Sequence, residues 1–109
     1  MAVFPLKHVV VLKWVYADAK NLYEIRDRLD KKHFYTIIPR HDILVATSIA
    51  KPAAVIFVFL DKGGGGDLIM IQTPLGHYSY RELIHNVRLF ARFAGITIER
   101  IEQLQISGQ

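Results

Sequence analysis

Four basic side chains in one predicted helix form the pattern with the clearest chemical meaning in this sequence. Arg81, His85, Arg88 and Arg92 are separated by four, three and four positions. On an α-helix this spacing places them along one side, roughly 5–6 Å apart. A row of cationic groups can follow the phosphates of a nucleic acid. We therefore interpret the row as a polyanion-binding surface, and a merely solvated basic face is the structural alternative.

Other basic residues are predicted to support this row. Lys31 and Lys32 end an earlier predicted helix, where they also complement the negative end of the helix dipole. Arg40 lies a few residues further along. The chain of 109 residues has a formal net charge of +4, which is compatible with DNA or RNA as a partner and favours neither. We expect binding without sequence specificity.

Apolar residues beside the row suggest a second surface. Leu89 and Phe93 lie neither on the basic row nor on the predicted core side of the helix. A helix that is apolar around much of its circumference needs a second buried contact, most simply in a homodimer. With Tyr78 and Tyr80 these residues form a predicted interface. A protein-interaction or structural subunit of a larger complex is accordingly an alternative function.

The run of four glycines, Gly63 to Gly66, raises the question of a phosphate-binding loop. Such a loop normally leads from a strand into the N-terminus of a helix. Here the glycines lie between two apolar segments that are typical of strands, and Asp61 and Asp67 flank them with negative charge. We therefore predict a β-hairpin connection.

Catalytic patterns are weak throughout the chain. His77 and Ser79 lack an identifiable acid partner, and Ser79 is better explained as a helix cap. The sequence has no cysteine and no close histidine pair, which excludes disulfides and thiolate zinc sites. We expect a non-enzymatic protein with no cofactor and no metal. Whether Asp42, Asp61 and the histidines converge is left open by the sequence.

One resemblance keeps a nuclease-like alternative open. The segments "PAAVIFVFLD", "LIMIQTP" and "SYRELIHNVRLFARFAG" loosely resemble parts of non-catalytic subunits of the tRNA-splicing endonucleases, which share the restriction-endonuclease-like fold. That fold has a helix, three strands and another helix in order. The metal motif of its nucleases is broken here, because Asp61 and Lys62 are adjacent. The resemblance thus implies a degenerate or absent active site.

The predicted elements make up one α+β domain over residues 1–109, with residues 1–5 and 107–109 frayed. Strands are expected at 8–17, 35–38, 42–49, 53–61 and 67–74, helices from Asp18 and from Ser79 to Ala94, and a last strand before the C-terminus. We summarise the order as β-α-β-β-β-α-β, a two-layer sandwich of two helices on a four- to five-stranded mixed sheet. The strands at 8–17 and 53–61 are apolar on both sides, which predicts burial of both faces.

The same composition predicts a cytoplasmic protein without a membrane contact. No apolar run approaches the roughly 20 residues that cross a bilayer. The absence of cysteine suits a reducing compartment. Half of the residues, 51%, are hydrophobic, so a chain of this length can build a substantial core.

Overall fold

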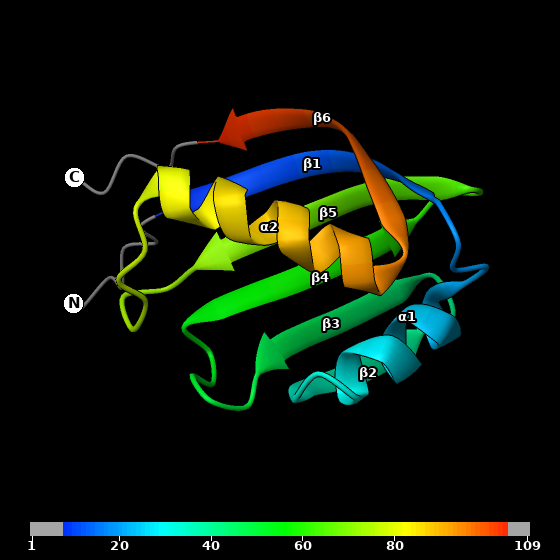
Figure 1. Cartoon of the computed structure of the whole chain (residues 1–109), viewed down its shortest axis with the longest axis horizontal. Coiled ribbons are helices and arrows are strands. Elements are labelled where there is room, and N and C mark those ends of the chain that lie inside the picture. The colour runs from blue at the N-terminus through cyan, green and yellow to red at the C-terminus, as the bar shows by residue number, and fades with distance from the viewer. Residues whose placement is uncertain (1–7, 105–109) are drawn as a thin grey trace.

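The computed structural model describes residues 8–104, and the chain ends expected to fray lie outside this range. Two helices and six strands follow one another along the chain (Figure 1). They are β1 (His8–Tyr16), α1 (Leu22–Asp30), β2 (Phe34–Arg40), β3 (Ile43–Ser48), β4 (Val55–Asp61), β5 (Gly65–Gln72), α2 (Tyr80–Ala94) and β6 (Ile96–Leu104). The α+β class is confirmed.

The sheet differs from the prediction in strand number and in direction. Its six strands follow the order β2-β3-β4-β5-β1-β6. Every neighbouring pair is antiparallel, so the sheet is not mixed. Four strands separate α1 from α2, because Phe34–Arg40 forms a full strand at the edge of the sheet. The order of helix, three strands and helix on which the nuclease-like resemblance rests is therefore absent.

Edge strand β2 tolerates Pro39 near its end. Proline cannot donate a hydrogen bond to a neighbouring strand, so it is confined to edges and bulges. The register of β2 against β3 shifts between Ile37 and Arg40, where Pro39 lies. The sequence predicted a short strand that stops before Pro39. The strand in fact continues to Arg40, and Pro39 lies in its irregular last part.

The helix boundaries follow local capping chemistry. In α2, the Ser79 side chain accepts a hydrogen bond from the Glu82 amide, and the Glu82 carboxylate accepts one from the Ser79 amide, which is a capping box. Gly95 ends this helix in the left-handed conformation, with φ of 81°. Both features confirm the prediction. The cap predicted at Asp18 is wrong, because Asn21 caps α1 and Asp18 pairs with Arg28.

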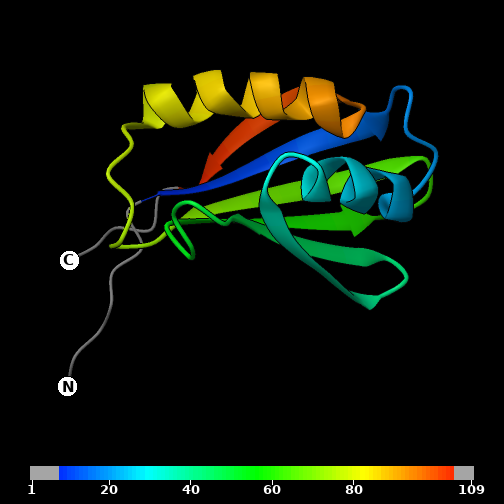
Figure 2. The ribbon, with the colours of Figure 1, turned by 60° about the horizontal axis from the view of Figure 1, so that its bottom comes forward.

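Both helices pack on one face of the sheet, and Figures 1 and 2 show them on the same side. The core joins buried residues of both helices with alternate residues of the strands, including Trp14, Phe59 and Met70. An aromatic group continues it, in which the rings of Phe57 and Phe90 stack at 4.3 Å.

No helix of the described residues covers the opposite face of the sheet, where Val9 is buried but Val11, Ile56 and Val58 are only partly buried. The burial predicted for both faces of β1 and β4 is therefore only partial on this face.

The glycine run forms the hairpin between β4 and β5, as predicted. Gly63 and Gly64 have φ of 100° and 75°, and the Lys62 amide donates to the Gly65 carbonyl across the turn. Gly65 and Gly66 already belong to β5. A Cβ on Gly66 would lie 1.9 Å from the Leu60 carbonyl oxygen. Two glycines therefore make the turn, and the next two allow close backbone approach.

Candidate nucleic-acid interface

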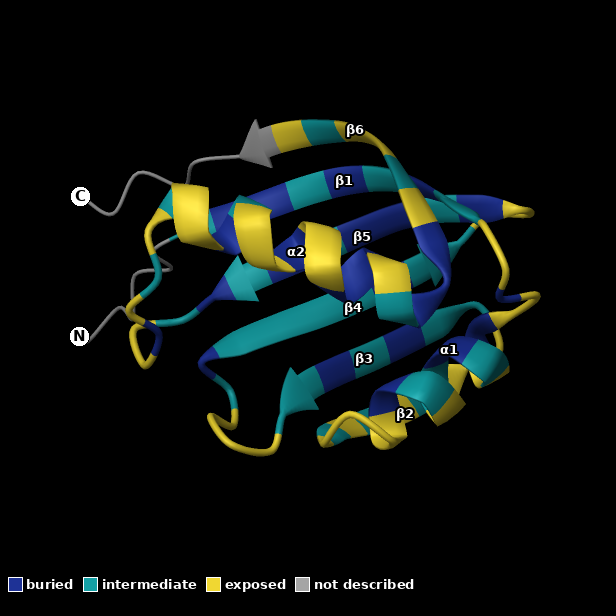
Figure 3. Ribbon diagram, viewed as in Figure 1, coloured by how far each residue is buried: buried dark blue, intermediate teal, exposed yellow. Residues whose placement is uncertain are grey.

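The predicted basic row is intact on the outer side of α2. Arg81, His85, Arg88 and Arg92 are all exposed, and the outer side of this helix is exposed along its length (Figure 3). The opposite side of the helix buries Leu83, Val87, Phe90, Ala91 and Ala94 in the core. At 1.5 Å per residue the row is about 16 Å long. Core packing thus fixes which way the four basic side chains point.

The charges of this row are not neutralised within the described chain. None of its members forms an ion pair there. Six other cations do pair with acids: Lys13, Arg26, Arg28, Arg40, Lys62 and Arg100. The acid in the first turn of α2, Glu82, is engaged in the capping box. Hydrogen bonds from Ser79, chiefly from its backbone amide, hold the pKa of this carboxyl below its usual value.

A hollow lies where the row ends. It has a volume of about 380 Å³ and is lined by Arg88 and Arg92 of α2, by Asp18 of the loop after β1 and by the first residues of β6. Asp18 is paired with Arg28, so its charge is balanced from α1. Gly95 closes the hollow and accepts backbone hydrogen bonds from residues 17–19. Two arginines thus share one concave surface at the C-terminal end of the row.

The three supporting cations do not all join the row. Lys32 lies close to α2, with its ammonium 5.8 Å from the centre of the Phe93 ring. Lys31 is the C-cap residue of α1 and is exposed. Arg40 ends β2 and forms an ion pair with Asp42 at 3.4 Å. Lys32 therefore extends the basic surface of α2, whereas Arg40 has a partner of its own.

The predicted apolar interface is smaller than the sequence suggested. Leu89 is 49% exposed, as an interface residue would be. Phe93, Tyr78 and Tyr80 instead pack partly against the core. Tyr78 lines an apolar cavity of about 250 Å³ between α2 and the β3–β4 side of the sheet, where the ammonium of Lys51 lies 5.2 Å from its ring centre. These three aromatic residues mainly serve the domain itself.

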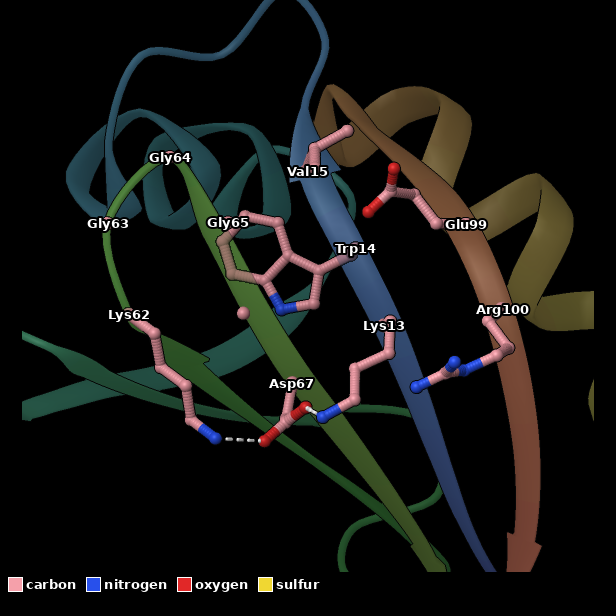
Figure 4. A pocket seen from close by; sticks show the side chains of 11 residues that line it. Lys13, Trp14, Val15, Lys62, Gly63, Gly64, Gly65, Asp67, Glu99 and Arg100 are labelled. Atoms are coloured by element: carbon pink, nitrogen blue, oxygen red, sulfur yellow. Dashed lines mark hydrogen bonds and ion pairs between the residues drawn. The ribbon is translucent and has the colours of Figure 1, made fainter.

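The hairpin glycines border a larger, open hollow of about 600 Å³ (Figure 4). Asp67 lies in it with Lys13 and Lys62 on either side, and both lysines donate to its carboxylate. These hydrogen bonds, with that from Lys13 the stronger cause, lower the pKa of Asp67. The Gly63 amide donates to Asp61. The cations and the turn amide are therefore already engaged, as a structural turn requires.

The acids weighed as metal ligands do not converge. The described residues contain no group of three or more histidine, cysteine, aspartate or glutamate side chains that could hold an ion. Asp61 accepts a hydrogen bond from the Tyr16 hydroxyl at 2.6 Å. Burial and this acid together raise the pKa of Tyr16. Asp61 is thus committed to a structural bond at the end of β4.

One face of the sheet, opposite to the two helices, is left without a helix over it in the part of the chain that the structure describes, which the sequence pattern did not predict. Its residues alternate along each strand with those of the core. The signal was present, because β1 and β4 are apolar at successive positions, but it was interpreted as burial of both faces. Only the number and placement of the helices show which face is left uncovered.

Comparison with known proteins gives no relative: no protein-family model, curated protein or solved structure matches the chain. Within residues 8–104, neither helix is long and apolar enough to cross a membrane.

Proposed function

We propose that this protein is a small non-enzymatic module that binds nucleic acid, without sequence specificity, through the basic row of α2. The observation that carries the proposal is the exposure of Arg81, His85, Arg88 and Arg92 on one side of one helix, where no acid among the described residues forms an ion pair with them. A row about 16 Å long spans about five phosphates of one strand at 3.4 Å each.

Affinity in this proposal comes from release of counterions by the three arginines of the row. Three phosphate contacts correspond to a slope of about −3 for log K against log salt on duplex DNA, and about −2 on a single strand. No acid of residues 8–104 forms an ion pair with a side chain of the row, so the arginines can adapt to different backbones. Binding should therefore depend on salt and little on base sequence.

The direct test is charge reversal within the row. Arg88→Glu with Arg92→Glu should weaken binding to a labelled 20-nucleotide DNA or RNA by about tenfold or more at 50 mM salt, because both phosphate contacts become repulsive. Fluorescence anisotropy at 50 and 200 mM salt measures the affinity and its salt dependence. The variant should also show a shallower slope.

A matched control separates the row from net charge. Lys20→Glu with Lys51→Glu changes the net charge equally, and both lysines are exposed outside α2. At 200 mM salt this control should lose less than about threefold in affinity, since the Debye length is then below about 8 Å and the long-range field is largely screened. Equal losses in the two double variants would contradict a specific role for the row.

A further inference from the structure

The uncovered face of the sheet is largely apolar across β1 to β5 and becomes charged at β6, where Glu102 and Arg100 lie in register with Val11 and Lys13. Side chains that share this face are identified by the strand register, which aligns them in three rows. The first row holds Val9, Ile71, Ile56, Thr47 and Tyr35; the second holds Val11, Ile69, Val58, Val45 and Ile37; the third holds Lys13, Asp67, Leu60 and Ile43. We call these residues the open face.

An antiparallel sheet with one solvated face normally carries polar residues there. The open face is instead mostly valine, isoleucine and leucine; its polar side chains are Thr47, Tyr35 and the charged pair of Lys13 and Asp67 at one end of the third row. Tyr35 and Ile37, at the edge, are 57% and 61% exposed. A contiguous apolar surface of this kind marks an interaction site.

Both edges of the sheet are protected, in contrast to its open face. Pro39 and a register shift interrupt edge strand β2. At the other edge, β6 carries exposed Glu99, Arg100 and Glu102, and Arg100 pairs with Glu102 at 2.8 Å. Charges, prolines and bulges are the usual means of preventing strand addition. Association is therefore directed to the face.

We propose that the open face is covered by the open face of a second copy of this chain. Its charges favour a like surface over a charged partner, because the carboxylate of Asp67 and the ammonium groups of Lys13 and Lys62 already pair with one another within the described chain. Stacking two such faces buries no unpaired charge. Two sheets of equal twist also pack face to face at about 30°, which a two-fold axis permits.

The size of the open face fits a weak, specific dimer. Five strands at about 4.8 Å and three rows at about 7 Å give a surface of roughly 20 Å by 20 Å. Two side-chain surfaces of this extent bury on the order of 1,000 Å² together, near the lower limit for specific interfaces. Dimerisation should therefore depend on concentration, with a dissociation constant on the order of tens of micromolar.

The dimer has a definite arrangement of its helices. Because both helices pack on the covered face, stacking the open faces places both helical layers outside. The two α2 rows then lie on opposite outer surfaces and cannot contact the same short duplex side by side. The dimer itself does not depend on the proposed nucleic-acid binding, so either proposal can fail alone.

Sedimentation equilibrium from about 1 to 500 µM tests the dimer. We expect the mean mass to rise from the monomer's 12.5 kDa to twice that value. Val58→Glu, in the middle of the open face, should remain monomeric throughout with an unchanged circular dichroism spectrum. The milder pair Val58→Thr with Ile69→Thr, which keeps β-branched side chains, should weaken dimerisation about tenfold or more if the glutamate variant does not fold.

Leu89→Glu is the matched control, since it places the same charge on the exposed apolar residue of α2. It should dimerise like the unaltered chain. Loss of the dimer in this variant, or its survival in both open-face variants, would overturn the proposal. A chain that stays monomeric at 500 µM would also overturn it. If deletion of residues 1–7 then produced dimers, those residues would be the occupant in place of a second copy.

Discussion

The two faces of the sheet are both largely apolar, but only one of them is covered by helices of residues 8–104. The covered face places Trp14 and Phe59 under the helices at 1% and 0% exposure. The open face carries Val11 and Val58 in equivalent positions on the same strands, without a helix over them. Apolar residues in a strand thus identify a sheet interior only when enough other elements exist to cover both faces. Here α1 and α2 suffice for one.

The strongest test of this comparison is a pair of substitutions at adjacent positions in β4. Phe59→Ala should lower the free energy of unfolding by about 3–5 kcal/mol, because its ring is fully buried and contacts Trp14 and Phe90. Val58→Ala should cost only about 1 kcal/mol in the monomer, because its side chain is only partly buried and its loss leaves no closed cavity. Urea denaturation near 1 µM, below the expected dimer range, measures both values.

Equal losses of unfolding free energy in Phe59→Ala and Val58→Ala would contradict this difference between the two faces. Such a result would mean that Val58 is as well packed as Phe59 in the monomer. The open face would then be covered by part of the same chain, and the predicted dimer would lose its surface.

A second pair of substitutions tests the β4–β5 hairpin, where the four glycines lie. Gly66 lies opposite Trp14 on β1, and Gly66→Ala should cost about 2–3 kcal/mol, because its new Cβ would meet the Leu60 carbonyl. Gly64→Asn is the control, since no atom lies within 4 Å of a Cβ there and asparagine tolerates positive φ. It should cost less than about 1 kcal/mol.

Urea denaturation measures the loss of unfolding free energy in both variants. Equal losses would contradict the assignment of Gly64 to the turn and of Gly66 to close backbone approach. In that case all four glycines would serve the turn conformation alone. The larger loss at Gly66 would instead show that close packing between β4 and β5 requires glycine in the strand itself.

The sequence predicted local structure better than tertiary arrangement. Ser79 with Glu82, and Gly95, carry capping chemistry within a few residues, so the bounds of α2 could be predicted. The exposure of Arg88 and Arg92 followed from helical periodicity alone. The sequence could not predict that Arg40 pairs with an acid whereas, within residues 8–104, the arginines of the row do not, because the folded chain decides which acid lies near each cation. The uncovered face was missed because it depends on where two helices pack.

The smallest expected effect concerns the only acid on the open face. Asp67→Asn should cost about 1 kcal/mol at pH 7, because it weakens bonds to Lys13 and Lys62, whose side chains are 36% and 62% exposed. The pKa of Asp67 is lowered in the folded state. Its ionised form therefore stabilises the fold above the unfolded pKa of about 3.9.

Urea denaturation of both proteins at pH 7, 5 and 3 tests the sign of this linkage. The difference between them should be constant from pH 7 to 5 and should shrink as the pH falls below about 4 toward the folded pKa, where Asp67 becomes protonated. Asp27→Asn is the control, because its carboxylate is 62% exposed and pairs with the adjacent Arg26. A difference that grew on acidification would mean that the lysines do not stabilise the charge. Asp67 would then be an unfavourable charge on an apolar face, and stacking two such faces would be opposed by it.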